Sequence, residues 1–61
     1  MKQLEKIFSL FDSGFSVFIV TKQNHLMPYE ITYKTTYSDE KVFDEGWQIN
    51  IEDIEHFEIA Y

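Results

Sequence analysis

The first pattern in the chain is helical. Apolar residues follow one another at helical spacing, with polar residues between them: Leu4, Ile7, Phe8 and Phe11. Positions three and four residues apart lie on the same side of an α-helix, so residues 2–12 predict an amphipathic helix with one apolar face. Gly14 follows this segment, and glycine adopts the left-handed conformation at the end of a helix without a steric penalty from Cβ. We therefore expect the helix to end just before Gly14.

Strand patterns fill most of the remaining chain. Residues 15–21 are β-branched and aromatic, and apolar residues occupy both alternating sets, which is typical of a central strand. Residues 27–34 alternate between apolar and polar positions, so one face of that strand should be exposed. Pro28 cannot donate a ladder hydrogen bond and should lie at the start of the strand or on a sheet edge. The shorter strand candidates are 41–43 and 47–51, separated by a turn at 44–46.

Two turns and a C-terminus of mixed period complete the pattern. The turns are the polar segments 22–25 and 37–40. From Ile51 to Phe57 the apolar residues are spaced by three, whereas the last residues alternate with a period of two. We therefore expect a short helical turn followed by a strand. Asn50 stands where its side chain can cap that turn.

These elements predict an α+β fold. A helix before short strands, joined by connections of about 2–6 residues, favours an N-terminal helix packed on a small antiparallel sheet of four to five strands. An SH3-like small barrel with an N-terminal helix is the alternative, since the same strands can close on themselves. The 61 residues form a single domain, 1–61, because so short a chain supports one core. The aromatic residues expected in that core are Phe8, Phe11, Phe15, Phe18, Trp47 and Phe57.

Charge is distributed unevenly along the chain. Eleven acidic residues against five basic ones give a net charge of −6, and every basic residue is a lysine. Residues 1–38 carry four lysines and three carboxylates, whereas 39–61 carry eight carboxylates and only Lys41, a balance of −7. Such asymmetry is typical of a chain with a charged partner. We expect the strands and turns of the C-terminal half to form one negative face.

No residue pattern indicates catalysis or a cofactor. His25 and His56 stand far apart, without a second histidine four residues away or an adjacent serine nucleophile. The paired carboxylates lack the spacing that brings about six to eight oxygen ligands around Ca²⁺. Cysteine is absent, which excludes thiolate ligands and disulfides and favours a reducing compartment. We therefore expect no enzymatic activity, no cofactor, no metal site and a cytoplasmic location.

The same composition argues against two classes of partner. Nucleic-acid binding needs a positively charged groove along the phosphate backbone, and the net charge of −6 opposes it. The longest apolar run, 17–20, is far shorter than the roughly 20 residues that span a bilayer. We expect neither direct nucleic-acid binding nor a membrane-spanning segment.

These observations favour a small acidic protein-binding module that docks on a basic surface of a larger protein and inhibits or regulates it. Small size, acidity and the absence of arginine favour a phage-type inhibitor that mimics nucleic acid. Tyrosine and tryptophan are good interface anchors, because their rings tolerate one solvated end. The residues expected to bind the partner are Asp39, Glu40, Asp44, Glu45, Glu52, Asp53, Glu55, Tyr29, Tyr33 and Trp47.

The alternative is a structural homo-oligomer with no partner-directed activity. Domains below about 70–80 residues often need support beyond their own core, and self-association can supply it. In that case the negative charge serves solubility. The two hypotheses differ in their response to salt, because ionic strength weakens the docking of opposite charges but not apolar self-association.

Overall fold

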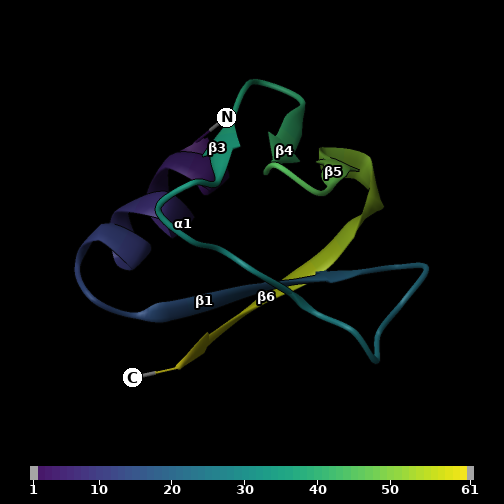
Figure 1. The fold of residues 1–61 in the computed structure, drawn as a ribbon, viewed down its shortest axis with the longest axis horizontal. Helices are drawn as coiled ribbons and strands as arrows, with labels where there is room; N and C mark the ends of the chain where they lie inside the picture. Colours follow the sequence, from purple (N-terminus) through teal and green to yellow (C-terminus); the bar gives the residue numbers. More distant parts are fainter. Residues whose placement is uncertain (1, 61) are drawn as a thin grey trace.

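The computed structural model describes residues 2–60, which contain one α-helix and six short strands (Figure 1). The helix α1 (Lys2–Asp12) comes first, and a 3₁₀ turn, η1 (Ile51–Asp53), precedes the last strand. The strands are β1 (Ser16–Thr21), β2 (Tyr29–Glu30), β3 (Thr36–Tyr37), β4 (Lys41–Phe43), β5 (Gln48–Asn50) and β6 (Ile54–Ala60). The predicted α+β class is confirmed.

The strands form two antiparallel sheets of three strands each, in the orders β2-β1-β6 and β3-β4-β5. β1 is central in the first sheet, as its apolar residues on both faces predict. It pairs along its whole length with β6, with Ser16 opposite Ala60 and Ile19 opposite Phe57. This arrangement differs from the predicted single sheet of four to five strands.

The difference arises within the predicted strand over residues 27–34. β2 ends at Glu30, and a turn at 31–35 precedes β3. Two threonines hold this turn: the Thr32 N–H donates to Thr35 Oγ1 at 2.9 Å, and the Thr35 N–H donates to the Thr32 carbonyl at 2.9 Å. Threonine hydroxyls that bond nearby main chain compete with the ladder of a sheet. The predicted strand is therefore reduced to Tyr29–Glu30, and β3, which lies beyond residues 27–34 and was not predicted, joins the second sheet.

The turns around the strands follow the sequence pattern closely. Gly14, two residues after the last residue of α1, has a φ of 103°, a left-handed value that disfavours any residue with a Cβ. The predicted helical turn and final strand correspond to η1 and β6. Asn50 precedes η1, but its side chain makes no capping hydrogen bond, so the predicted cap is wrong. The turn expected at 37–40 begins one residue later, because Tyr37 pairs with Val42.

The core lies between α1 and the two sheets, and it is aliphatic. Its buried residues are Leu4, Ile7, Val17, Ile19, Ile31, Val42 and Ile49. The aromatic residues expected there surround it instead: Phe8, Phe11, Phe15, Trp47 and Phe57 are half-buried and pack against it. Phe18 is also half-buried, and it points to the other face of β1 because side chains alternate along a strand. So small a core accommodates branched aliphatic side chains more readily than many rings.

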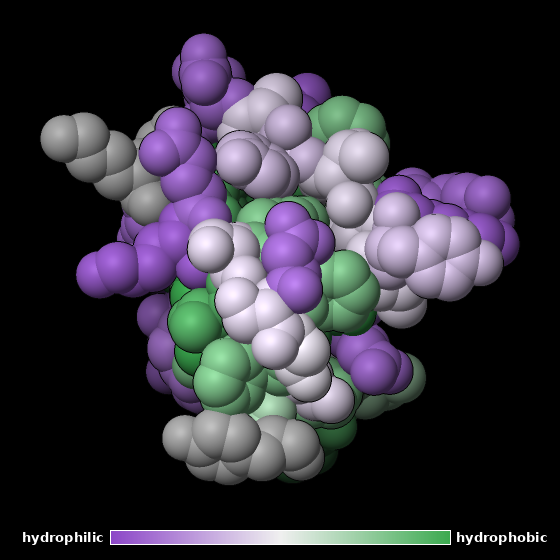
Figure 2. All heavy atoms as spheres, turned by 90° about the vertical axis from the view of Figure 1, so that its left-hand side faces the viewer, coloured by the Kyte–Doolittle hydropathy of each residue, from purple (hydrophilic) through white to green (hydrophobic). Residues whose placement is uncertain are grey.

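Large apolar side chains also remain at the surface. Leu26 and Met27, in the β1–β2 loop, are 92% and 67% exposed, and Tyr33 is 85% exposed. Figure 2 shows apolar side chains reaching the surface between polar ones on the side of the molecule that carries α1. Within residues 2–60, no helix has the length and apolarity needed to cross a membrane.

Candidate protein-binding surface

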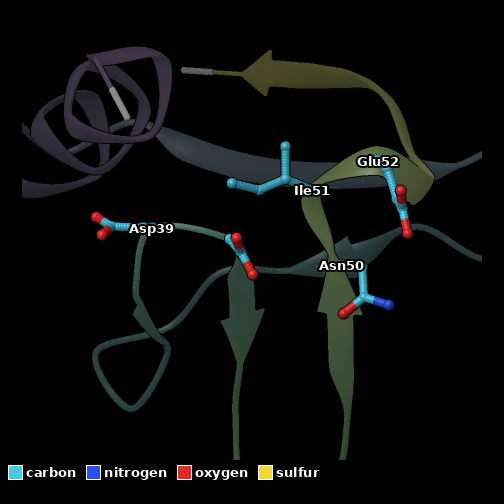
Figure 3. A pocket seen from close by; sticks show the side chains of 5 residues that line it. Asp39, Asn50, Ile51 and Glu52 are labelled. Atoms are coloured by element: carbon cyan, nitrogen blue, oxygen red, sulfur yellow. The ribbon is translucent and has the colours of Figure 1, made fainter.

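A hollow open to solvent lies where the second sheet meets η1, with a volume of about 420 Å³. It is lined by Asp39, Glu40, Asn50, Ile51 and Glu52. Figure 3 shows Asp39 on the turn before β4, and Asn50 and Glu52 at the end of β5 and on η1. The Ile51 side chain extends from η1 toward the side of the turn before β4. Because three of the five lining residues are carboxylates, we call this feature the acidic hollow.

Main-chain contacts hold the walls of the acidic hollow. The Ser38 N–H donates to the Lys41 carbonyl at 2.9 Å and closes the β3–β4 turn. The Ile51 N–H donates to the Glu40 carbonyl at 2.9 Å and ties η1 to the same turn. In the β4–β5 ladder, Lys41 pairs with Asn50. The backbone therefore sets the positions from which the carboxylates project.

Within the described residues, the carboxylates of the acidic hollow have no side-chain partner. Among residues 2–60, no ion pair and no side-chain hydrogen bond involves Asp39, Glu40 or Glu52. All three residues are exposed. Unpaired like charges around a concave surface strengthen the local negative potential and attract cations. The acidic hollow can therefore receive a basic side chain.

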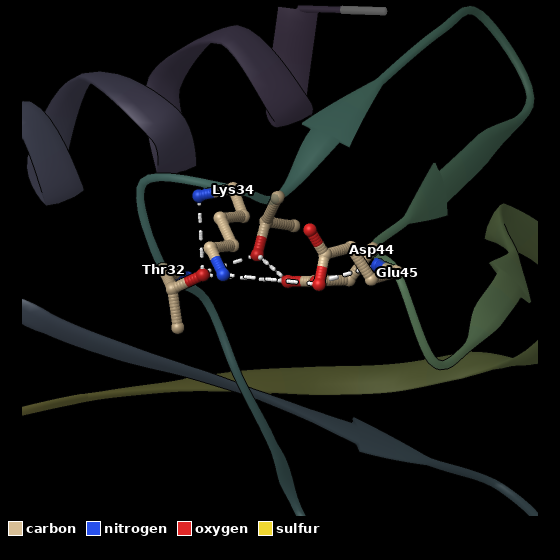
Figure 4. Close-up of polar contacts among 5 residues, drawn as sticks. Thr32, Lys34, Asp44 and Glu45 are labelled. Atoms are coloured by element: carbon tan, nitrogen blue, oxygen red, sulfur yellow. Dashed lines mark hydrogen bonds and ion pairs between the residues drawn. The ribbon is translucent and has the colours of Figure 1, made fainter.

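Asp44, in contrast, is engaged by its own chain (Figure 4). Its Oδ2 accepts hydrogen bonds from Thr35 Oγ1 at 2.7 Å and Thr32 Oγ1 at 3.3 Å, and its Oδ1 accepts one from the Glu45 N–H at 2.6 Å. The Thr35 hydroxyl, followed by the Glu45 N–H, lowers the pKa of Asp44 below its usual value of 3.8. Lys34 Nζ lies 3.7 Å from Glu45 Oε2. Asp44 thus joins the turn between β2 and β3 to the turn between β4 and β5.

One carboxylate of η1, Asp53, and one of β6, Glu55, contact the β1–β2 loop. Gln23 Nε2 donates to Asp53 Oδ1 at 3.1 Å. Glu55 contacts the His25 imidazole, and its Oε2 lies 4.0 Å from His56 Nδ1. These contacts fasten the loop to the C-terminal part of the chain. Asp53 and Glu55 are therefore less available to a partner than the carboxylates of the acidic hollow.

The three predicted aromatic anchors differ in their surroundings. Tyr29 and Trp47 pack on each other with ring centroids 5.1 Å apart and planes tilted by 55°. Both are half-buried against the core. Tyr33 lies in the turn between β2 and β3 and is 85% exposed. Of the three, Tyr33 offers the largest share of its ring to a partner.

The predicted acidic residues therefore differ in their contacts: Asp44, Glu45, Asp53 and Glu55 meet side chains of the chain itself, whereas Asp39, Glu40 and Glu52 meet none among residues 2–60. Asp39 and Glu40 lie near the Lys41 end of the β4–β5 hairpin, whereas Asp44 follows Phe43 at the other end. Two of these contacts join residues far apart in the sequence: Thr35 and Asp44 are 9 positions apart, and Gln23 and Asp53 are 30 positions apart. No local pattern signals such distant pairs, so sequence reasoning did not find these threonine and glutamine contacts.

Comparison with protein-family models, curated proteins and solved structures gave no match to this chain. Within residues 2–60, no group of three or more histidine, aspartate or glutamate side chains is arranged to hold a metal ion. The functional argument therefore rests on the charge and shape of the surface.

Proposed function

We propose that this protein is a small acidic module that docks on a basic surface of a larger protein and inhibits or regulates it. The acidic hollow carries this proposal. Asp39, Glu40 and Glu52 are exposed and come from two segments, and no side chain among residues 2–60 compensates their charge. A lysine or arginine of the partner would supply the missing counter-charge.

The electrostatics of the whole chain support the same proposal. Asp39, Glu40 and Glu52 line one hollow, so a single bound cation would interact favourably with more than one negative charge. The net charge of −6 also steers a basic surface toward the molecule and speeds association. In the phage-type form of this function, the carboxylates would take the place of phosphates in a nucleic-acid site of the partner.

Tyr33 is the aromatic anchor that we propose for this surface. Interfaces typically bury a few aromatic side chains at their centre, surrounded by polar contacts. Tyr33 is 85% exposed, so most of its ring is available for burial. Tyr29 and Trp47 are half-buried and already pack on each other, so we assign them a supporting part at the rim.

We further infer that the two sheets are halves of an SH3-like small barrel. Two contacts support this interpretation of the fold. The Ile31 N–H donates to the Val17 carbonyl at 2.9 Å, which extends the first sheet toward the turn that leads into β3. The Ile51 N–H bond to Glu40 ties η1, which leads into β6, to the turn before β4. Such a barrel would hold the acidic hollow on a rigid frame.

Two matched variants test the proposed function. The first, Asp39→Asn with Glu40→Gln and Glu52→Gln, removes three charges from the acidic hollow. The second, Glu5→Gln with Asp12→Asn and Glu30→Gln, removes three charges from exposed positions on α1 and β2. Each immobilised protein is used to capture partners from its source cells at low salt, with elution by a salt gradient. We expect the first variant to lose the captured protein and the second to retain it.

Equal loss in both variants would show that overall charge, rather than the acidic hollow, attracts the partner. Retention by both would overturn the proposal. Circular dichroism and thermal unfolding of all three proteins establish that each variant is folded, because exposed substitutions of this kind usually change stability by about 0.5 kcal/mol or less.

A further inference from the structure

The outer edge of β6 has no neighbouring strand within residues 2–60. β6 is the last strand in the order β2-β1-β6, and it is seven residues long (Figure 1). The strands at the other sheet edges contain only two or three residues. Short edge strands offer little main chain for pairing, whereas a long one presents a row of unpaired N–H and C=O groups. β6 is thus the one described edge that suits the addition of another strand.

The register shows which main-chain groups of β6 point outward. The Ile31 N–H bonds the Val17 carbonyl at 2.9 Å, so the main chain of Val17 faces β2. In an antiparallel ladder, successive residues direct their N–H and C=O groups to opposite sides. Phe18 therefore faces β6, where its partner is Glu58. The β6 residues whose N–H and C=O groups face away from β1 are then Phe57 and Ile59.

The side chains along this edge alternate in character. Phe57 and Ile59 lie opposite Ile19 and Val17, on the core side of the sheet, and Ile59 is still 44% exposed. Glu58 lies on the other face and is exposed, and its Oε2 lies 3.2 Å from Nε2 of His56 on the same face. An added strand would therefore meet apolar side chains on one face and a carboxylate on the other.

A second hollow, of about 130 Å³, lies beside this edge. Leu4 and Gln3 of α1 and Ile51 form one side, and residues 54–57 form the other. Within residues 54–57 the register with β1 shifts, since Val20 pairs with His56 and Thr21 with Ile54, so this irregular segment of β6 forms part of the hollow. The hollow offers a place beside Phe57 for an apolar side chain of an added strand.

We propose that β6 receives an extended segment of the partner in which basic and apolar residues alternate. This inference rests on the proposed function and specifies how the partner is held. Main-chain hydrogen bonds to Phe57 and Ile59 supply affinity, and the hollow and the alternation of side chains supply specificity. A basic residue of the segment lies beside Glu58. A second copy of this chain is a poor occupant, because each copy carries a net charge of −6 and Glu55 and Glu58 lie on the edge strand itself.

The test uses two synthetic peptides of about twelve residues with identical lysine and valine content. One alternates lysine and valine, and the other places the lysines and the valines in separate blocks. Binding to the full chain is measured by fluorescence anisotropy, and exchange protection of the backbone amides is measured by NMR. We expect the alternating peptide to bind about tenfold more tightly and to protect the amides of Phe57 and Ile59 from exchange.

Two variants of the chain sharpen the test. Ile59→Pro removes an N–H that points outward from β6 and does not bond β1, so the protein should stay folded. This variant should bind the alternating peptide about tenfold or more weakly than the unaltered protein does. Glu58→Gln should weaken the binding of the alternating peptide about two- to fivefold. Glu30→Gln is the matched control, because Glu30 lies opposite Phe18 on the other edge of the same sheet. Its effect should be smaller than that of Glu58→Gln.

Three results would overturn the inference: equal affinity for both peptides, unprotected Phe57 and Ile59 amides, or protection of these amides by a second copy of the chain at high protein concentration. The amide measurement uses the unaltered protein, so it decides the matter even if Ile59→Pro does not fold. Equal affinity for both peptides, together with loss of partner capture in the acidic-hollow variant, would reject strand addition and leave the proposed function intact.

Discussion

Carboxylates of the same chemical type have different roles in this protein, and their neighbours decide which. Asp44 accepts three hydrogen bonds, two of them from the hydroxyls of Thr35 and Thr32. Asp39 and Glu40 accept none from side chains among residues 2–60. The first arrangement fastens two turns together, whereas the second leaves charge available to a partner.

We expect Thr35→Val to raise the pKa of Asp44 toward its usual value of 3.8, because the Thr35 hydroxyl is the largest cause of the lowered pKa. A lowered pKa contributes stability that is fully present above the usual value and is lost as the pH falls through the lowered one. The free energies of unfolding of the variant and the unaltered protein should therefore converge below about pH 4. NMR titration of the Asp44 carboxyl and urea unfolding between pH 2 and 7 measure both effects. Thr36→Val, at an exposed position of β3, is the control and should leave the pKa of Asp44 unchanged.

The burial of a side chain, rather than its size, should determine how much stability is lost when the side chain is truncated. Ile19 is fully buried, whereas the larger Phe18 is half-buried on the other face of β1. Ile19→Ala should lower the free energy of unfolding by about 2–5 kcal/mol, and Phe18→Ala should lower it by less. Urea unfolding of both variants measures the difference. A larger loss for Phe18→Ala would contradict the burial described for β1.

At the level of elements, the segments with a regular local pattern form as predicted. α1 ends in the turn at Gly14, and β1 takes the centre of its sheet. β2 is shorter than the strand predicted over residues 27–34, because threonine contacts form a turn after it, and the sequence did not predict β3. The length of a strand here depends on what its polar side chains bond, and not only on its periodicity.

At the end of α1, backbone conformation rather than steric crowding should determine the effect of a substitution on stability. Gly14 has a φ of 103°, and an added Cβ would meet no atom within 4 Å. Gly14→Ala should therefore destabilise the protein by about 1–2 kcal/mol through backbone strain alone. Gly46 also has open space around it but no left-handed φ, so Gly46→Ala should change stability by less than about 0.5 kcal/mol. Thermal unfolding of the two variants distinguishes strain from crowding.

The whole molecule combines a small aliphatic core with a strongly acidic surface. The radius of gyration is 10.5 Å, and the buried core cluster draws on α1 and both sheets. The net charge of −6 opposes the close approach of two copies. The acidic surface therefore favours docking on a basic partner over the formation of a homo-oligomer.

We expect the protein alone to elute as a monomer at low and at high salt, and to capture its partner only at low salt. Screening weakens attraction between exposed opposite charges, since the Debye length falls from about 10 Å at 0.1 M salt to about 3 Å at 1 M. Size-exclusion chromatography with light scattering, with and without partner, measures both states. A dimer or tetramer that is indifferent to salt would favour the structural homo-oligomer instead.

The sequence by itself determined the helix over residues 2–12, the central strand and the excess of negative charge after residue 38, because these depend on neighbours along the chain. Only the tertiary structure decided which carboxylates meet polar partners and which line the acidic hollow. It also decided that aliphatic side chains fill the core and that, among the described residues, no strand pairs with the outer edge of β6. Each of these outcomes depends on contacts between residues far apart in the sequence, and a local period carries no information about them.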